Sequence, residues 1–180
     1  MIYDGIIEGR YCNLKSVTME DAEFTLALRK NPNFTKYLPK LNITLEQQRE
    51  WIKKQQRDPT DYFFVVWDKN ENRIGTMGLY DIQDGIGETG RLAMNGNSLQ
   101  AIEAQLLCVD FAFDILKLKG LKSFILAENK RALKFAELFG PNISEPRKNE
   151  NGELVCDAVN TKHLYMIQRP KLERMLYRNR

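Results

Sequence analysis

The stretch that decides the fold is NSLQAIEAQLLCVDFAFDILKLKGL, residues 97–121, which predicts a long helix followed by a turn into a strand. Its apolar residues recur at spacings of 3, 4, 3, 4 and 3, the period of a helix with one buried face. Asn97 can cap this helix, with Gln100 three residues later, and Lys119-Gly120 can end it. The periodic residues are Leu99, Ile102, Leu106, Val109, Phe113 and Leu116.

Strands are expected on both sides of this helix, at 89–94 and at 121–127. A strand, a helix and a second strand form a crossover connection, which places the two strands parallel and is right-handed in nearly all proteins. The sequence therefore predicts a sheet with a parallel pair at this point.

The segments on either side complete a mixed α/β domain around one sheet. Thr18 with Asp21, and Thr44 with Gln47, have the spacing of capping boxes and begin two helices. The predicted order of elements is β α α β β β α β α β β. The remaining expected elements are strands at 10–17, 62–67, 73–82, 153–159 and 163–168, and a helix at 129–139.

We expect one domain over residues 1–170, followed by a basic tail at 171–180. The 180 residues carry 27 Lys and Arg against 24 Asp and Glu, and the net charge of +3 is too small to imply nucleic acid or membrane. Hydrophobic residues make up 43%, which excludes a disordered chain, yet no apolar run approaches the roughly 20 residues of a membrane span. Leu172, Met175 and Leu176 have helical spacing, which favours a docking helix over a frayed end.

Cysteine and histidine usage favours a cytoplasmic protein without a metal site. Cys12, Cys108 and Cys156 are odd in number and far apart, which is typical of reduced thiols. His163 is the only histidine, so a site rich in histidine is excluded. Residues 1–5 contain no basic region followed by an apolar block, and we expect no secretory signal.

Residues 85–90 read Gly-Ile-Gly-Glu-Thr-Gly and match the G-x-G-x-x-G pattern of dinucleotide-binding turns. That pattern needs to lead directly into a helix whose N-terminus meets the pyrophosphate. Here it leads into another strand, so we expect a structural turn.

The start of the long helix, residues 96–101, is a better candidate for a phosphate site. It follows a strand directly, and a helix start offers unpaired backbone N–H groups and the positive end of the helix dipole. From the local chemistry alone, an ordinary capped helix is the simpler interpretation.

Several patterns occur in an order that resembles the GNAT superfamily of acyl-CoA N-acyltransferases, over about residues 8–169. They are Leu14-x-x-Val17-Thr18-x-x-Asp21, Ile74-Gly75-x-x-Gly78, Glu103-Ala104, Asp110-Phe111-Ala112-Phe113, Leu118-Lys119-Gly120-Leu121 and Asn129-x-x-Ala132 ending at Gly140. The resemblance rests on their order and spacing together. It implies a single GNAT-like domain, with a mostly antiparallel sheet flanked by helices, that transfers acetyl from acetyl-CoA to an amine.

The resemblance also implies where the cofactor binds and which residue takes the proton. Backbone groups of Leu92, Ala93 and Met94 would pair with the pantetheine, and Asn129 matches a cofactor-facing asparagine of the family. Glu88 matches the carboxylate that deprotonates the attacking amine, with a solvated turn residue as the alternative interpretation. The residues that would hold the pyrophosphate are Asn97, Ser98, Leu99, Gln100 and Ala101, and no metal is implied.

Two positions depart from the family pattern. Leu99 stands where the pyrophosphate loop normally has glycine, and it narrows the approach to the backbone. Ala136 stands where the family often has a tyrosine that protonates the leaving thiolate. A thiol leaves well unaided, because its pKa is about 8.5, so this loss weakens the mechanism without abolishing it.

Arg29, Asn31 and Tyr37 come from the region in which the family builds its acceptor pocket, and Asn31-Pro32 after Arg29 resembles nucleotide-sugar N-acetyltransferases. The surrounding loop, residues 31–42, contains Lys36 and Lys40 and no acidic residue, which suits an anion beside a flat ring. We therefore expect the acceptor to be the amine of a small molecule, a nucleotide-linked amino sugar.

The alternatives are a protein N-terminus, as in ribosomal-protein alanine acetyltransferases, and a non-catalytic GNAT-like interaction module. We expect no nucleic-acid or membrane partner, and either a monomer or a homodimer.

Overall fold

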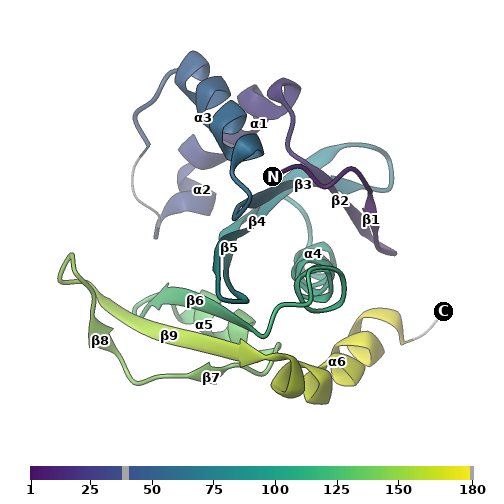
Figure 1. The fold of residues 1–180 in the computed structure, drawn as a ribbon, viewed down its shortest axis with the longest axis vertical. Coiled ribbons are helices and arrows are strands. Elements are labelled where there is room, and N and C mark those ends of the chain that lie inside the picture. The colour runs from purple at the N-terminus through teal and green to yellow at the C-terminus, as the bar shows by residue number, and fades with distance from the viewer. Residues whose placement is uncertain (38–40, 179–180) are drawn as a thin grey trace.

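The computed structural model describes residues 1–37 and 41–178, in which one sheet carries helices on both faces (Figure 1). The strands are β1 (Ile7–Glu8), β2 (Cys12–Ser16), β3 (Tyr62–Asp68), β4 (Arg73–Gln83), β5 (Ile86–Met94), β6 (Gly120–Leu126), β7 (Asn142–Ile143), β8 (Arg147–Lys148) and β9 (Leu154–Thr161). The helices are α1 (Ala22–Lys30), α2 (Pro32–Thr35), α3 (Leu45–Arg57), α4 (Ser98–Asp110), α5 (Lys130–Glu137) and α6 (Lys162–Tyr177). A single turn of 3-10 helix, Met19–Asp21, precedes α1.

The strand order is β1-β2-β3-β4-β5-β6-β9-β7, with β8 paired to β9. Every pair is antiparallel except β5 with β6, which confirms the parallel pair expected around the long helix. This parallel ladder is short, because only residues 86–88 of β5 pair with residues 120–122 of β6. Beyond Glu88 and Lys122 the two strands separate, and Figure 1 shows β6 and β9 turning away from β5.

Two apolar clusters hold the layers together. The larger one packs α4 against β2, β3 and β4 around Phe64, Met77 and Phe111, and α6 covers α4 and the end of β9. The smaller one packs α1 and α3 on the opposite face, around Ile52, Phe63 and Val65. Alternate residues of β3 therefore serve different clusters, as expected for a strand that is buried on both faces.

The three predicted helix starts are confirmed by their capping boxes. Thr18 pairs with Asp21, Thr44 with Gln47, and Asn97 with Gln100, each through reciprocal side-chain and backbone hydrogen bonds. The predicted long helix is α4, which continues through a π-helical turn at Phe111–Ile115. The loop expected at 31–42 contains the short helix α2 in its first part.

The prediction of a strand at 163–168 is wrong, because these residues lie in the first half of α6. Thr161 caps the helix by accepting a hydrogen bond from the Leu164 N–H. Tyr165, Leu172 and Leu176 recur at helical spacing and are all at least 98% buried. The short apolar run at 164–167 fits either period, and the burial of the later residues decides for the helix.

The boundary expected at residue 170 accordingly falls inside α6. The docking helix expected from Leu172, Met175 and Leu176 is present, with Leu172 and Leu176 buried, but Met175 points to solvent and is 44% exposed. The fold class is confirmed as one mixed α/β domain with a mostly antiparallel sheet flanked by helices. No helix in the described part of the chain is long and apolar enough to cross a membrane.

Candidate active site

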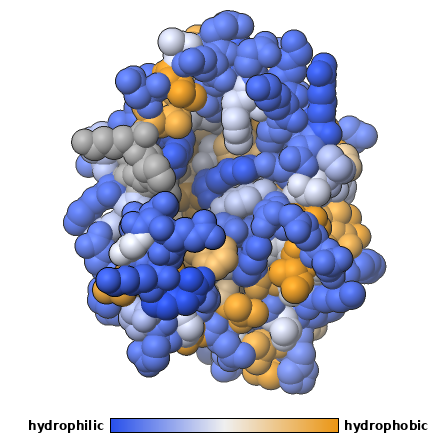
Figure 2. Space-filling view, turned by 60° about the vertical axis from the view of Figure 1, so that its left-hand side comes forward, coloured by the Kyte–Doolittle hydropathy of each residue, from blue (hydrophilic) through white to orange (hydrophobic). Residues whose placement is uncertain are grey.

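A cleft of about 570 Å³ opens where β5 and β6 separate. Its walls are the second half of β5, the inner face of β6, one side of α4, the apolar side of α5 and the end of α2. Figure 2 turns this side of the molecule forward and shows a hollow bordered by hydrophilic residues. Strands that separate within a sheet leave backbone N–H and C=O groups free of ladder partners, so an extended ligand can pair with them.

Five of the predicted cofactor residues line the cleft, namely Leu92, Ala93, Met94, Ala101 and Asn129. Asn129 caps α5, since its side chain accepts a hydrogen bond from the Ala132 N–H at 3.1 Å. The other four predicted residues, Asn97 to Gln100, form the exposed first turn of α4 and do not line the cleft itself.

The first turn of α4 already pairs some of the backbone N–H groups that a ligand could otherwise use. The Asn97 side chain accepts from the Gln100 N–H at 3.0 Å, and the Gln100 side chain accepts from the Asn97 N–H at 2.9 Å. A helix start leaves about four N–H groups unpaired, and this capping box occupies two of them. Leu99 lies in the same turn and is 37% exposed, so its side chain stands beside the groups that a phosphate would approach.

A bulge interrupts β5 at the cleft. Thr76 of β4 pairs with Ala93, and Gly78 pairs with Gly90, so that Arg91 and Leu92 together face one residue of β4. Arg91 has a φ of 53°, a left-handed conformation that costs a residue with a side chain about 1–2 kcal/mol. The Thr76 hydroxyl donates to the Arg91 carbonyl at 2.8 Å and fixes this turn of the backbone.

The structure places Glu88 at the last rung of the β5–β6 ladder, opposite Lys122 and directly before the cleft. Its side chain is half-buried and does not line the cleft. The Tyr80 hydroxyl donates to Glu88 Oε1 at 2.8 Å. Burial raises the pKa of Tyr80, and the nearby Glu88 charge adds to this, so the phenol keeps its proton and remains a donor at neutral pH.

The predicted acceptor residues divide into two groups. Tyr37 lines the cleft, and its ring lies 4.9 Å from Lys36 Nζ. Hydrogen bonding to Tyr37 raises the pKa of Lys36, which stays cationic. The structure does not bring Arg29 and Asn31 into the cleft lining.

Arg29 is half-buried near the end of α1, where burial lowers the pKa of its guanidinium and the positive charge of Arg91 adds to this. The Asn31 side chain caps α2 by accepting from the Asn33 N–H at 3.0 Å. Lys40, the other lysine of the predicted loop, lies outside the described residues.

Sequence reasoning missed the role of α5. No residue of α5 is buried, and its apolar residues Ala132, Phe135 and Ala136 line the cleft. An apolar stripe has the same period whether it faces protein or a ligand, so the sequence offered no signal to separate the two. Ser123 and Asn160, also in the lining, were missed because they look like ordinary strand residues.

The cleft has a marked charge bias. Its described lining residues include the three cations Lys36, Arg91 and Arg131 and no aspartate or glutamate. Tyr37 is the one phenol among them, and Ala136 contributes only a methyl group. No cluster of three His, Cys, Asp or Glu that could hold a metal ion occurs within residues 1–37 and 41–178. The arrangement suits an anionic ligand with an extended, partly apolar arm.

The predicted G-x-G-x-x-G turn is a β-hairpin, as expected. Gly85 lies in the turn between β4 and β5 with a φ of 83°, and Gly87 and Gly90 lie within β5 itself. The strand is therefore three residues longer at its start than predicted.

Comparisons with known proteins agree with this geometry. A family model described as "Acetyltransferase (GNAT) domain" matches residues 12–141. The acetyltransferase PseH of Campylobacter jejuni strain 81-176 is 24% identical over 124 residues, covering 68% of this chain and 77% of that protein. The probable N-acetyltransferase YjcK of Bacillus subtilis strain 168 is 27% identical over 150 residues, covering 75% and 82%.

Solved structures share the fold. The apo form of FdhC, described as a nucleotide-linked sugar GNAT, superimposes with a TM-score of 0.80 at 22% identity, covering 97% of this chain and 99% of that one. A spermidine N-acetyltransferase from Vibrio cholerae, in complex with CoA and spermine, gives a TM-score of 0.79 at 20% identity, covering 87% and 98%.

Proposed function

Because the chain belongs to the GNAT acetyltransferase family, and is therefore an acetyl-CoA-dependent N-acetyltransferase, we propose that its acceptor is a primary amine on a small phosphate-bearing molecule, a nucleotide-linked amino sugar. The observation that carries the proposal is the charge of the cleft, whose described lining holds Lys36, Arg91 and Arg131 and no carboxylate. Asp61, outside the lining, neutralises Arg91 through a two-pronged ion pair, so Lys36 and Arg131 supply the positive charge that favours a ligand carrying phosphate.

The end of α2 supports the same acceptor class. Phe34, Lys36 and Tyr37 lie together on one wall of the cleft and offer aromatic rings beside a positive charge. A nucleotide has a flat base and a charged diphosphate, which match these two features. A polyamine such as spermidine would need carboxylates instead. The two solved structures compared above are of a nucleotide-linked sugar GNAT and a spermidine N-acetyltransferase, and the charge of this cleft favours the nucleotide sugar.

The acyl donor is proposed to lie between β5 and β6. Backbone groups of Leu92, Ala93 and Met94 would pair with its extended arm, beside Asn129. Ser98 and Leu99 would offer the α4 N–H groups that the capping box leaves for the pyrophosphate, and Ala101 would form the floor beneath it. A backbone N–H in the bulged part of β5 would polarise the thioester carbonyl. Bound acetyl-CoA supplies the activated acetyl group.

Glu88 is proposed as the general base. The substrate amine must lose a proton before its nitrogen attacks the thioester carbon, and the Glu88 carboxylate takes that proton directly or through a water. Tyr80 holds one oxygen of this carboxylate at 2.8 Å. As the carbon–sulfur bond breaks, the thiolate leaves without a side-chain acid at Ala136.

We place this reaction in the cytoplasm, in a monomer or homodimer that needs neither nucleic acid nor membrane. The three buried free cysteines support a reducing compartment.

The substrate class is tested with a panel of amines at fixed acetyl-CoA, following release of free CoA. The panel contains nucleotide-linked amino sugars, the same sugars without the nucleotide, spermidine and a peptide with a free N-terminus. Turnover is expected with the nucleotide-linked sugars and should be much weaker with the free sugars. Turnover confined to spermidine or to the peptide would contradict the proposed acceptor while leaving the enzyme class intact.

A further inference from the structure

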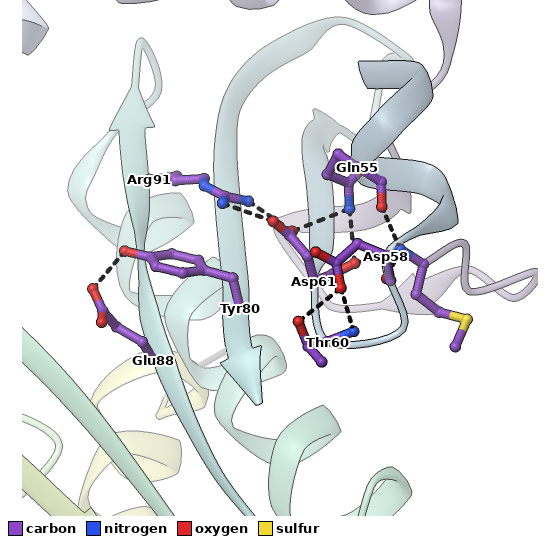
Figure 3. A network of polar contacts seen from close by, with 8 residues as sticks. Gln55, Asp58, Thr60, Asp61, Tyr80, Glu88 and Arg91 are labelled. Carbon is purple, nitrogen blue, oxygen red and sulfur yellow. Dashed lines mark hydrogen bonds and ion pairs between the residues drawn. The ribbon is translucent and has the colours of Figure 1, made fainter. Parts of the chain in front are cut away.

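The bulge in β5 is clamped from the side by a partly buried ion pair (Figure 3). Arg91 Nη1 and Nη2 donate to the two carboxylate oxygens of Asp61, each at 2.7 Å. Asp61 is only 8% exposed, and its carboxylate also accepts from Gln55 Nε2 at 3.1 Å. The carboxylate is therefore held on both sides, by the end of α3 and by the bulge.

The Arg91 guanidinium is also enclosed by aromatic rings. It lies 4.1 Å from the ring centre of Tyr80, 5.1 Å from that of Trp51 and 5.6 Å from that of Phe63. Glycine at 78 makes room for the Arg91 stem, because a Cβ there would lie only 3.0 Å from Arg91 Cδ. Three aromatic rings and the glycine at 78 therefore position the Arg91 side chain.

These contacts continue from Arg91 through Tyr80 to Glu88. Tyr80, which stacks under Arg91, donates its hydroxyl proton to Glu88 Oε1, and Figure 3 shows the Tyr80 ring between Glu88 and the Arg91–Asp61 pair. A Cβ at Gly90 would lie 2.5 Å from the Tyr80 hydroxyl oxygen, so glycine is needed there as well. A single row of contacts, Asp61 to Arg91 to Tyr80 to Glu88, therefore joins the strained backbone of the cleft wall to the proposed base.

We propose that Asp61 is a positioning residue for acyl transfer, which fixes Arg91 and through it both the bulged backbone of β5 and the Tyr80–Glu88 pair. This inference rests on the proposed function, because it assumes that β5 and Glu88 act on the thioester and the amine. Catalytic groups need to be held near their productive geometry, and a misplacement of about 1 Å can cost roughly 10²-fold in rate. A left-handed arginine on a cleft wall needs such support, since nothing in its own conformation favours it.

The pair also explains why arginine stands at 91. A lysine would keep the charge but lose the planar, two-pronged contact with a carboxylate and the stacking on Tyr80. Arg91→Lys therefore loosens the clamp while keeping the cation in the cleft lining. Asp61→Asn keeps the acceptor for Gln55 but sets an amide N–H₂ against the guanidinium.

The test compares Asp61→Asn and Arg91→Lys with a matched control, Asp157→Asn. Asp157 forms the same two-pronged pair with Arg147, at 2.6 and 2.7 Å, on the β8–β9 hairpin. Two readouts are measured on the full chain: kcat and KM for acetyl transfer, and the 13C shift of the carbonyl of bound [1-13C]acetyl-CoA. The second readout reports polarisation of the thioester and needs no acceptor.

Both clamp variants should lower kcat by roughly 10- to 100-fold with little change in the KM for acetyl-CoA. They should also reduce the carbonyl shift that the wild type produces, whereas Asp157→Asn should change neither readout. The double variant should cost no more than the worse of the two single variants, because both act through one pair.

Wild-type kcat and carbonyl shift in the clamp variants would overturn the inference, and so would an equal loss in Asp157→Asn. If Asp61→Asn does not fold, Arg91→Lys alone carries the test. A wild-type protein that does not bind acetyl-CoA would contradict the proposed function itself. A wild type that binds and turns over while the clamp variants do the same contradicts only the role of Asp61.

Discussion

Glu88 is the side chain on which the proposed proton transfer depends. The register of the sheet puts it on the last paired rung of β5 and β6, opposite Lys122, and the next residue, Thr89, already lines the cleft. The Tyr80 hydroxyl at 2.8 Å occupies one carboxylate oxygen and orients the group. The proposed role of Glu88 thus rests on a fixed position one residue before the cleft lining begins.

Glu88→Gln should lower kcat by roughly 10²–10⁴-fold and leave the affinity for acetyl-CoA nearly unchanged, because the amide keeps the shape but cannot accept the proton. The measurement is steady-state acetyl transfer together with calorimetric binding of acetyl-CoA. Glu150→Gln, on an exposed loop, serves as the control. Full activity in Glu88→Gln would mean that bulk water or another group is the base.

For single residues, the sequence predicts where a residue lies along the elements better than which side chains contact it. Glu88, Asn129 and Tyr37 could be singled out because the order of motifs resembles the GNAT family, whose site positions they match. The Asp61–Arg91 pair joins residues 30 positions apart across the sheet, so no local pattern indicates it. Arg29 was selected for its chemistry alone, and its place on α1 keeps it out of the cleft lining.

The element that we propose to hold the pyrophosphate is the first turn of α4. Its capping box was predictable, because Asn97 and Gln100 have the required spacing. The same bonds consume the N–H groups of residues 97 and 100, which leaves those of Ser98 and Leu99 for a phosphate. Leu99 stands at this point with its side chain 37% exposed.

Leu99→Gly should tighten acetyl-CoA binding by roughly 2- to 30-fold, since one unobstructed hydrogen bond to a phosphate contributes about 1.5–3 kcal/mol and ordering a glycine in the helix costs about 1 kcal/mol. Calorimetry on the purified variant measures this change. Leu99→Ala separates the effect of side-chain volume from that of backbone flexibility, because alanine removes most of the side chain but keeps the restriction on φ. Weaker binding in both variants would show that the Leu99 side chain itself contacts the cofactor.

The elements that the sequence predicts poorly are those with short or ambiguous apolar runs. The helix α4 and the strands β3 and β4 carry a clear period, and their bounds came close to the structure. The start of α6 was taken for a strand, because only the burial of Leu172 and Leu176 against α4 selects the helix. The apolar side of α5 lines the cleft, and its period alone cannot distinguish a helix that faces a core from one that faces a cleft.

The molecule as a whole is tied together by one buried carboxylate. Glu103 of α4 is fully buried and accepts hydrogen bonds from the backbone N–H groups of residues 10, 11 and 12, at 2.8, 2.6 and 2.8 Å. It also accepts one from the Tyr177 hydroxyl at 2.9 Å. The turn before β2, the long helix and the end of α6 therefore meet at a single group.

Glu103→Gln should lower the free energy of unfolding by about 3 kcal/mol or more, because an amide sets an N–H₂ group against a cluster of donors and removes the charge that they solvate. Urea unfolding followed by circular dichroism measures the loss. Glu137→Gln, on the exposed side of α5, should stay within about 0.5 kcal/mol of the wild type. Equal stability of the two variants would contradict the role given to Glu103.

The central claim is that the cleft between β5 and β6 holds acetyl-CoA, and calorimetric titration of the full chain with acetyl-CoA tests it most directly. We predict saturable binding of one molecule per chain, with a dissociation constant in the range of about 1 μM to 1 mM that is typical of enzyme substrates. Ala136→Trp, which fills the cleft from α5, should abolish the heat of binding while the protein remains folded. No binding to the wild type at millimolar acetyl-CoA, or undiminished binding to Ala136→Trp, would contradict the claim.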